Sequence, residues 1–481
     1  MFNGFAMDVT YFNGKRVTVQ GLGLHGGGVG IVKFLAKHGA QVIVTDLKTK
    51  DQLEPSITKL GAIKNIEYVL GQHRVENFTQ ADLVIKNPAV RWDSQHVQAA
   101  ISKGVPVEMD SSLFFKLCSN PIIGVTGTKG KTTTATAIYE ILKSAGRDVI
   151  QVGIGQVSVL DKLLELKRNT IVVFELSSWR LSALGRAKLS PQIAVLTNLM
   201  PDHLNYYRNM AEYAADKKNV FLFQKPSEWL VANADSRDIL EMVRGAKAQL
   251  VQFSTQPLQA EQAIFLSQEN MFWKEAGEIK KIIELSELKI RGQHNWSNLM
   301  AAAGACLAYG LTLAEVRRGL AEFKGVAHRL EFVRELNEVA YYNDTAATIP
   351  EAAILALKSF IEPVILIAGG SDKNLEFAEY AGAMLDGAKE IVLLQGKGTE
   401  KLLIEIQKDP RFAGRKIEIA ESMKQAVGLA AGLAQAGDVV LLSPGAASFG
   451  MFQNEFDRGD QFKKAVNELS TCTKMEARQS D

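Results

Sequence analysis

Residues 123–134, with the sequence IGVTGTKGKTTT, constrain the fold of this chain more than any other stretch. They follow a short apolar approach and precede the helical pattern Ala135, Ile138, Leu142, so we expect a strand, a glycine-rich loop and a helix N-terminus. This arrangement directs backbone N–H groups at a polyphosphate, with Lys131 reaching the terminal phosphates and Thr132 ligating Mg²⁺. The strict P-loop pattern would need glycine at Val125, so the loop is one residue longer and indicates a variant nucleotide site.

Composition limits the remaining possibilities. At 481 residues the chain is too long for one ordinary domain, and its 47% hydrophobic and 22% charged residues are typical of globular proteins. A net charge of +2 gives no argument for a nucleic-acid or anionic membrane partner. Three scattered cysteines predict neither a disulfide framework nor a zinc site. We expect a cytoplasmic protein without membrane insertion, because no apolar run reaches about eighteen residues.

The N-terminal segment indicates a second phosphate-binding turn. A strand at 16–20 leads into Gly21-Leu22-Gly23-Leu24-His25-Gly26, and a second strand at 41–45 ends at Asp46. This is a G-x-G-x-x-G fingerprint followed by an acid, which specifies a tight turn and close backbone approach to a phosphate. It leaves three readings open: NAD(P), another phosphorylated ligand, or a structural turn. Strands at 83–85 and 105–107 would complete a Rossmann-like domain.

Two further α/β units follow. Strands at 170–174, 193–196 and 229–231 continue a parallel sheet from the P-loop, and short alternating segments within 251–290 predict a small antiparallel flap. Buried-type strands at 364–368, 390–394 and 438–442 indicate a Rossmann-like third unit. The prediction is therefore an α/β chain with three domains. They are a Rossmann-like domain at 1–118, a central P-loop ATPase domain at 119–325 and a Rossmann-like domain at 326–481.

Four features complement the P-loop, and each also has an ordinary structural reading. Glu175 ends an apolar strand, where it could hold the nucleotide's Mg²⁺ or merely cap a helix. His203 follows the next strand, within Thr197-Asn198-Leu199-Met200-Pro201-Asp202-His203, although isolated histidines are more often structural. Lys217 and Lys218 lie on a predicted helix, where lysines are ordinarily solvated. The fourth feature is the pair of polar turns at 343–348 and 369–373, which end strands of the third unit.

Together these motifs resemble the Mur ligase family along essentially the whole chain. Residues 127–132 are similar to the family's extended P-loop, 292–298 to its adenine-side segment, and 328–331 with 343–344 to the start of its C-terminal domain. Within the family, residues 21–24, 175–178 and 442–449, continuing to Arg458-Gly459-Asp460, resemble the branch that uses D-glutamate.

The resemblance implies an ATP-dependent amide ligase of peptidoglycan synthesis, a monomer that adds D-glutamate to UDP-N-acetylmuramoyl-L-alanine through an acyl phosphate. It implies four catalytic residues: Lys131, Glu175, His203 and Lys217. Two Mg²⁺ sites would use Thr132, Glu175, His203 and a carbamylated Lys217, which the Tyr-x-x-x-Lys spacing from Tyr213 favours over Lys218.

The implied binding residues form three groups. ATP would contact Gly127, Thr128, Lys129, Gly130, Lys131, Thr132, Thr133, Asn295, Arg329 and Asp344. The UDP end of the substrate would contact Gly21, Leu22, Gly23, Leu24, Asp46 and Lys48. D-glutamate would contact Thr348, Lys373, Ser448 and Phe449.

The sequence departs from the family pattern at three points and leaves alternatives open. The turn at 152–156 lacks the family's asparagine, Ala346 stands where many members carry lysine, and Glu455 stands where an aromatic residue is frequent. The alternatives are a sister Mur ligase that adds another amino acid, a folylpolyglutamate synthase, an NAD-dependent oxidoreductase and a non-catalytic nucleotide-gated scaffold. The N-terminal nucleotide domain argues against the folate enzyme, and an oxidoreductase would leave the P-loop, Glu175 and His203 unused.

Overall fold

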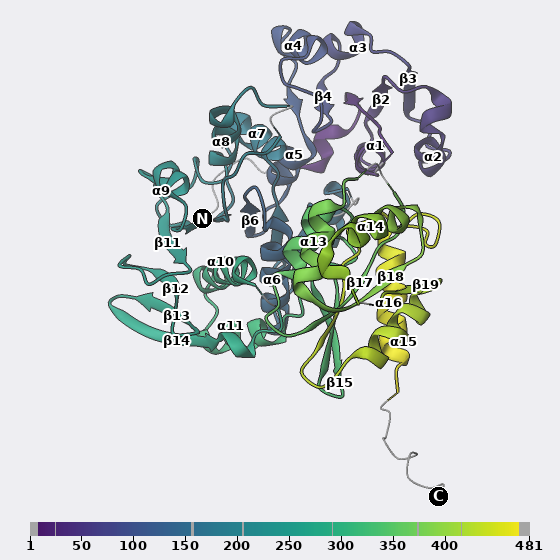
Figure 1. Cartoon of the computed structure of the whole chain (residues 1–481). Coiled ribbons are helices and arrows are strands. Elements are labelled where there is room, and N and C mark those ends of the chain that lie inside the picture. Colours follow the sequence, from purple (N-terminus) through teal and green to yellow (C-terminus); the bar gives the residue numbers. More distant parts are fainter. Residues whose placement is uncertain are drawn as a thin grey trace, which may run out of the picture. The chain divides into compact units, whose positions relative to one another are not determined.

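A computed structural model describes residues 8–24, 26–154, 158–203, 206–290, 292–372, 375–414 and 416–470 of the protein (Figure 1). By their internal contacts, the residues form two compact units. The first comprises Met1–Leu285 with Ser297–Leu320, and the second comprises Ser286–Trp296 with Ala321–Asp481. Within the described ranges, no helix combines the length and the apolar composition that crossing a membrane requires.

The first unit begins with a five-stranded parallel sheet in the order β3-β2-β1-β4-β5. Its strands are β1 (Arg16–Gln20), β2 (Gln41–Asp46), β3 (Ile66–Leu70), β4 (Leu83–Lys86) and β5 (Val107–Glu108). The connecting helices are α1 (Gly27–Lys37), α2 (Lys50–Leu60), α3 (Val75–Thr79), α4 (Gln95–Ser102) and α5 (Asp110–Leu117). The central strand β1 is buried from Val17 onward, including the polar side chains of Thr18 and Gln20, as is typical of the middle strand of a parallel sheet.

A nine-stranded sheet completes the first unit, in the order β14-β13-β12-β11-β10-β9-β6-β8-β7. The pairs from β7 through β8, β6, β9, β10 and β11 to β12 are all parallel. The pairs β12–β13 and β13–β14 are antiparallel and form the predicted flap as a continuation of the sheet. The strands are β6 (Ile122–Thr126), β7 (Val149–Val152), β8 (Ile171–Glu175), β9 (Ile193–Leu196), β10 (Trp229–Asn233), β11 (Gln249–Ser254), β12 (Ala263–Ser267), β13 (Asn270–Glu275) and β14 (Glu278–Glu284). The helices are α6 (Lys131–Ser144), α7 (Ser178–Ala187), α8 (Met210–Lys218), α9 (Arg237–Val243), α10 (Gln293–Tyr309) and α11 (Leu313–Glu322).

The second unit contains a six-stranded sheet in the order β15-β16-β20-β17-β18-β19. It is parallel except for the edge strand β15, which forms an antiparallel hairpin with β16. Its strands are β15 (Glu331–Leu336), β16 (Val339–Asn343), β17 (Val364–Ala368), β18 (Ala388–Leu394), β19 (Glu418–Ala420) and β20 (Val439–Leu442). Its helices are α12 (Pro350–Leu357), α13 (Ala378–Gly387), α14 (Lys397–Lys408), α15 (Met423–Leu433) and α16 (Glu455–Glu468). Short 3₁₀ helices along the chain are η1 (Val9–Phe12), η2 (Leu160–Glu165), η3 (Leu285–Glu287) and η4 (Pro410–Phe412).

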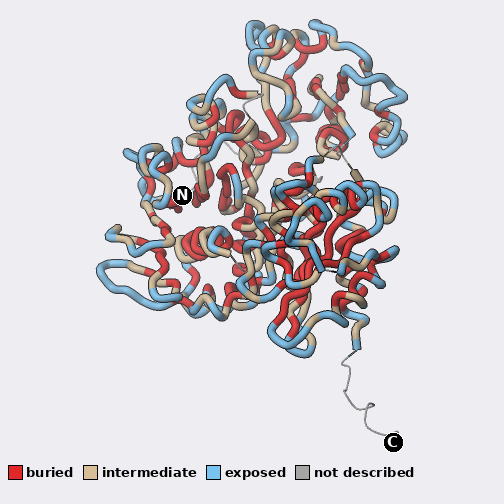
Figure 2. Tube along the Cα trace, in the orientation of Figure 1, coloured by how far each residue is buried: buried red, intermediate tan, exposed pale blue. Residues whose placement is uncertain are grey.

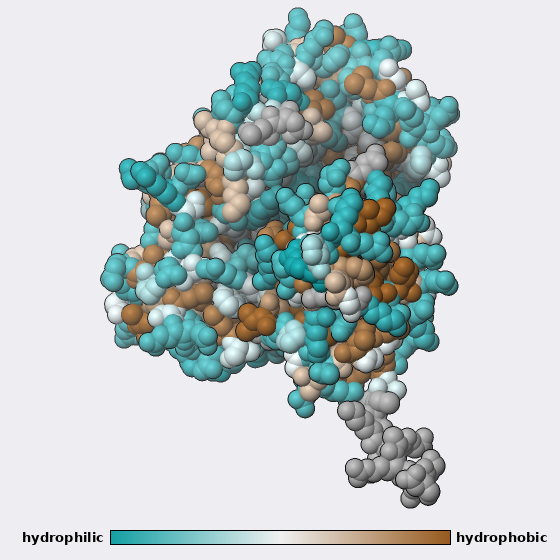
Figure 3. Space-filling model, viewed as in Figure 1, coloured by the Kyte–Doolittle hydropathy of each residue, from teal (hydrophilic) through white to brown (hydrophobic). Residues whose placement is uncertain are grey.

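Helices cover both faces of this six-stranded sheet, the third sheet of the chain. Residues of α12, α13 and α14 share one buried apolar cluster with Leu366, whereas α15 and α16 share another with Ile365 and Ile367. The alternation of consecutive β17 side chains between the two clusters follows from the two-residue period of a strand. Figure 2 shows the buried residues concentrated along the strands and the inward faces of the helices. On the face drawn in Figure 3, polar residues predominate and apolar ones are scattered among them.

The predicted fold class is confirmed: the chain is α/β, with mostly parallel sheets in its N-terminal, central and C-terminal regions. The sequence pattern did not identify β15, the antiparallel edge strand of the third sheet. The boundaries at 118 and 325 stay predictions, since the first two sheets belong to one contact unit and α10 has residues in both units.

Candidate active site

The glycine-rich loop lies between β6 and α6, as the sequence predicts. Gly130 caps α6 with a φ of 80°, a left-handed conformation that favours glycine. Lys131 begins the helix and folds back over the loop, where its Nζ donates to the carbonyl oxygens of Thr128 at 2.8 Å and Gly127 at 3.1 Å. A fourteen-residue helix therefore directs its N-terminus and a lysine at the same loop, the arrangement that receives phosphates.

The loop is held by residues that follow β9, the strand beside β6. Asn198 accepts from Lys129 N through Oδ1 at 2.8 Å and from Thr128 N through its carbonyl at 3.0 Å. Thr197 Oγ1 donates to the carbonyl of Lys129 at 2.7 Å. A Cβ added at Gly127 would lie 1.9 Å from Thr197 Oγ1, so this glycine is required by close packing as well as by its φ of 152°.

Thr197 and Asn198 hold the P-loop, a role that the sequence pattern does not assign to them. In the sequence they are only part of the polar segment before His203. The available signal was a polar pair directly after a buried strand, but the contact with the P-loop depends on β9 lying next to β6.

Thr132 and Glu175 are brought together. Thr132 Oγ1, in the first turn of α6, donates to Glu175 Oε2 at 2.8 Å, and Glu175 is the last residue of β8. A hydroxyl and a carboxylate at the mouth of a phosphate loop are the oxygen donors that Mg²⁺ prefers. The two predicted ligands of the nucleotide's metal ion are therefore in direct contact with each other.

Lys217 is almost completely buried, with an exposed fraction of 1%, and reaches the same loop from α8. Its Nζ donates to the carbonyl of Gly127 at 2.8 Å and lies 4.5 Å from the centre of the Tyr213 ring. Burial, together with the positive charge of Lys131, lowers the pKa of Lys217 to about 7. Lys217 therefore has a large neutral fraction at physiological pH, whereas an ordinary lysine would be protonated.

His203 lies at the edge of this cluster in a left-handed backbone conformation, with a φ of 54°. Its ring contacts Trp179 of α7, with 5.0 Å between the ring centres, and lies 6.2 Å from the ring of Tyr213. Its side chain is 40% exposed and its Nδ1 lies 4.0 Å from Asp202 Oδ1. The imidazole is thus held by aromatic contacts on the first unit while remaining accessible to ligands.

Among the described residues, no group of three or more histidine, cysteine, aspartate or glutamate side chains could hold a metal ion by itself. The predicted ligands Thr132, Glu175, His203 and Lys217 supply one carboxylate and one imidazole. These side chains would fill only part of an octahedral Mg²⁺ shell, so water, bound phosphates or a modified Lys217 would supply the remaining ligands.

The N-terminal glycine turn lies at the carboxyl ends of β1 and β2. Gly21 and Gly23 have φ values of 90° and 61°, and Asp46 accepts from Gly23 N through Oδ2 at 3.1 Å and from Lys48 N through Oδ1 at 2.9 Å. Leu22 is buried, whereas Leu24 is 43% exposed. The six predicted UDP-binding residues therefore lie at one edge of the first sheet.

Three predicted ATP-binding residues, Asn295, Arg329 and Asp344, belong to the second unit. Asp344 follows β16 and is 7% exposed; it accepts from Ser443 Oγ at 2.8 Å and from Leu330 N at 3.1 Å. Burial raises the pKa of Asp344 to about 7, although the two hydrogen bonds oppose this change. Asn295 is buried within α10.

The predicted D-glutamate residues follow two adjacent strands of the third sheet. Thr348 is in the segment after β16, whereas Ser448, which is buried, and Phe449, which is 55% exposed, are in the turn after β20. Ser371, after β17, donates through Oγ to the carbonyl of Phe449. Lys373 lies outside the described residues.

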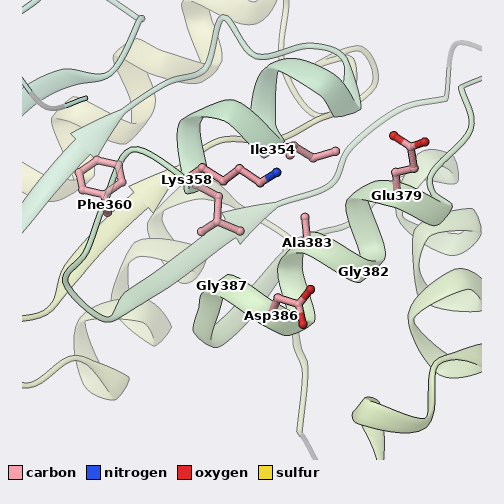
Figure 4. Close-up of a pocket in the computed structure, with 9 residues that line it drawn as sticks. Ile354, Lys358, Phe360, Glu379, Gly382, Ala383, Asp386 and Gly387 are labelled. Atoms are coloured by element: carbon pink, nitrogen blue, oxygen red, sulfur yellow. The ribbon is translucent and has the colours of Figure 1, made fainter. Parts of the chain in front are cut away.

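A separate cavity of about 470 Å³ opens between α12 and α13 in the second unit. Ile354, Leu357, Phe360 and Ala383 supply apolar walls, and Lys358, Glu379 and Asp386 also line it (Figure 4). None of the predicted site residues lines this cavity, so we do not include it in the candidate active site. The candidate active site consists of the residues described above, which follow the ends of strands.

Comparison with known domain families gives three matches in order along the chain. The Mur ligase MurD-like N-terminal domain matches residues 15–108, the Mur ligase middle domain matches residues 125–306, and the Mur ligase glutamate ligase domain matches residues 328–445.

Individual proteins agree with this pattern. UDP-N-acetylmuramoylalanine--D-glutamate ligase of Roseiflexus sp. (strain RS-1) is 41% identical over 467 residues, covering 95% of this chain and 99% of the relative. The ligase of the same name from Clostridium tetani (strain Massachusetts / E88) is 36% identical over 459 residues, covering 95% and 97%. A solved structure of UDP-N-acetylmuramoyl-L-alanyl-D-glutamate--2,6-diaminopimelate ligase shares the fold, with a TM-score of 0.58 at 20% identity over 97% of this chain and 95% of that one.

Proposed function

This chain belongs to the Mur ligase family, and we propose that it is the ATP-dependent ligase that joins D-glutamate to UDP-N-acetylmuramoyl-L-alanine in peptidoglycan synthesis. The observation that carries the proposal is the preformed contact between Thr132 and Glu175 beside the P-loop, in a chain that matches D-glutamate ligases over nearly its whole length. An oxidoreductase would give this phosphate-directed cluster no role.

The reaction proceeds in two transfers. A carboxylate oxygen of the alanyl group attacks the γ-phosphorus of ATP and ADP leaves, which gives an acyl phosphate. The uncharged amine of D-glutamate then attacks the acyl carbon, and the tetrahedral intermediate releases phosphate as the amide forms. The first transfer brings two anions together, the carboxylate and the γ-phosphate, so the helix N-terminus of α6 and Lys131 would stabilise negative charge on the transferring phosphoryl group.

The residues present fit Mg²⁺. Thr132 and Glu175 offer hard oxygen donors at the P-loop, and His203 is accessible nearby as the proposed ligand of a second ion. When bound, Mg²⁺ supplies positive charge between the carboxylate and the γ-phosphate. The unprotonated amine of Lys217 is the form that adds to CO₂, losing one proton as the N–C bond forms, and the resulting carbamate would be an anionic ligand.

The remaining predicted residues serve the ends of the substrates. The glycine turn at Gly21–Gly23, with Asp46 and Lys48, would hold the UDP group, whose phosphates suit a turn with exposed backbone N–H groups. Asn295, Arg329 and Asp344 would hold the nucleotide of ATP. Thr348, Lys373, Ser448 and Phe449 would surround D-glutamate. We further propose a monomeric enzyme that acts in the cytoplasm, because its three substrates are small polar molecules.

The test is phosphate release by the purified protein with ATP, Mg²⁺, UDP-N-acetylmuramoyl-L-alanine and one amino acid at a time. We expect release with D-glutamate and no release with L-alanine or L-lysine. Release only with another amino acid would replace the proposal with a sister ligase. Labelled oxygen in the alanyl carboxyl group must also appear in the released phosphate, and its absence would exclude the acyl phosphate.

A further inference from the structure

Arg458, in the first turn of α16, is the largest fully buried side chain among the described residues, with an exposed fraction of 0%. Its guanidinium makes three hydrogen bonds, all with neutral oxygens. Nε donates to Thr345 Oγ1 at 2.9 Å, Nη2 donates to the carbonyl of Thr345 at 2.9 Å, and Nη1 donates to the carbonyl of Ala446 at 3.0 Å. This part of the Arg458-Gly459-Asp460 motif has no role in the reaction described above.

The charge of Arg458 is not neutralised by a contacting carboxylate. The ion pairs among the described residues of the second unit do not include it. Burial lowers the pKa of Arg458 to about 10, so it stays protonated at neutral pH, and Glu455 attracts it only at longer range. A buried cation with neutral partners is costly for folding, which indicates a role other than stability.

The two residues that Arg458 contacts belong to the two turns predicted to bind D-glutamate. Thr345 is three residues before Thr348, and Ala446 is two residues before Ser448. The turns are also joined by Gly445 N donating to the carbonyl of Ala347 at 2.9 Å. A Cβ on Gly370, in the turn after β17, would lie 3.5 Å from Arg458 Nη1, so all three strand-end turns meet around the guanidinium.

We propose that Arg458 is a positioning residue of the D-glutamate site, which fixes the spacing of the turns carrying Thr348 and Ser448 and supplies a positive potential to them. The inference rests on the proposed function. D-glutamate has two carboxylates, and its amine must be uncharged to attack the acyl phosphate, so the reacting molecule is a dianion. A positive charge shielded from water acts on such a ligand with little screening, even without touching it.

The test compares steady-state constants for Arg458→Met, which keeps most of the volume and removes the charge, and Arg458→Lys, which keeps the charge and loses the planar fork. With Arg458→Met we expect KM for D-glutamate to rise about tenfold or more while KM for ATP changes less than about twofold. Arg458→Lys should raise KM for D-glutamate less than Arg458→Met does, because it keeps the positive charge. A merely structural role would change both KM values together or make the two variants equal, and either result overturns the inference.

The chain offers a matched control at the other end of the same helix. Arg334 donates to the carbonyl oxygens of Asn467, in the last turn of α16, and Leu469, its C-cap, so Arg334→Met also removes an arginine-to-carbonyl contact of this helix. It should leave KM for D-glutamate unchanged. If Arg458→Met does not fold, Thr345→Val, which removes the acceptor of Nε, takes its place with a smaller expected rise in KM.

The outcomes also separate this inference from the proposed function. If the unaltered enzyme releases no phosphate with D-glutamate, the proposed function fails before any variant is compared. If the enzyme is active with D-glutamate and Arg458→Met keeps its KM for D-glutamate, the proposed function stands and the role of Arg458 is refuted.

Discussion

Replacing Asp344 with asparagine tests whether a buried carboxylate of the second unit is kept at the expense of stability. Asp344 accepts hydrogen bonds from Ser443 Oγ and Leu330 N and is 7% exposed. Asparagine is nearly isosteric: its Oδ1 can still accept from Leu330 N, and its Nδ2 can donate to Ser443 Oγ. The substitution therefore removes the ionisable group while retaining the local contacts.

The sign and size of the effect follow from the pKa. The pKa of Asp344 is raised from 3.8 to about 7 in the folded protein. Between these values the folded chain holds a proton that the unfolded chain has lost, so the stability contributed by Asp344 is complete below pH 3.8 and is lost as pH rises through about 7. At about 1.4 kcal/mol per pKa unit, the loss between pH 5 and pH 8 is about 3 kcal/mol. Asp344→Asn has no ionisable group at this position, so it should not show this loss of stability.

The assay is chemical denaturation of both proteins at several pH values between 5 and 8. We expect the free energy of unfolding of Asp344→Asn, relative to the unaltered protein, to increase by about 3 kcal/mol over this range. The control is Asp409→Asn: Asp409 is partly exposed, and its hydrogen bonds with Arg411 lower its pKa to about 2, so the effect of this substitution should not vary between pH 5 and 8. A stability difference for Asp344→Asn that is flat with pH would refute the reasoning.

Three further predictions concern the P-loop cluster. Lys217→Ala should lose most activity and regain part of it with small carboxylates that replace the carbamate, measured as phosphate release with and without added formate. Lys218→Ala is the control and should keep its activity. If carboxylates do not rescue Lys217→Ala, the carbamate is contradicted. Gly127→Ala places a Cβ 1.9 Å from Thr197 Oγ1 and should abolish ATP binding in calorimetry, whereas Gly428→Ala, where no atom lies within 4 Å, should bind normally. Lys131→Ala should fold but show no turnover, and turnover at the ordinary rate would show that this lysine does not act on the phosphates.

Much of the candidate site could be predicted because its residues lie at the ends of strands with clear patterns. The run Ile122–Thr126 followed by glycines and Lys131 predicts a phosphate loop from local rules alone, and the structure places Thr132 against Glu175 at its mouth. The edge strand β15 was not identified, because its residues are only partly buried and its place in the sheet depends on pairing with β16, which in turn pairs with β20.

The sequence alone determined most of the strands, helices and glycine turns, although not β15, because apolar periodicity and glycine placement act over a few neighbouring residues. The tertiary structure decided which turns meet. Thr197 supports the P-loop only because β9 lies beside β6, and Arg458 contacts Thr345 and Ala446 only because β16 lies beside β20. The low pKa of Lys217 likewise arises from its burial against Gly127. Strand order and burial depend on contacts between residues far apart in the chain, which local patterns do not specify.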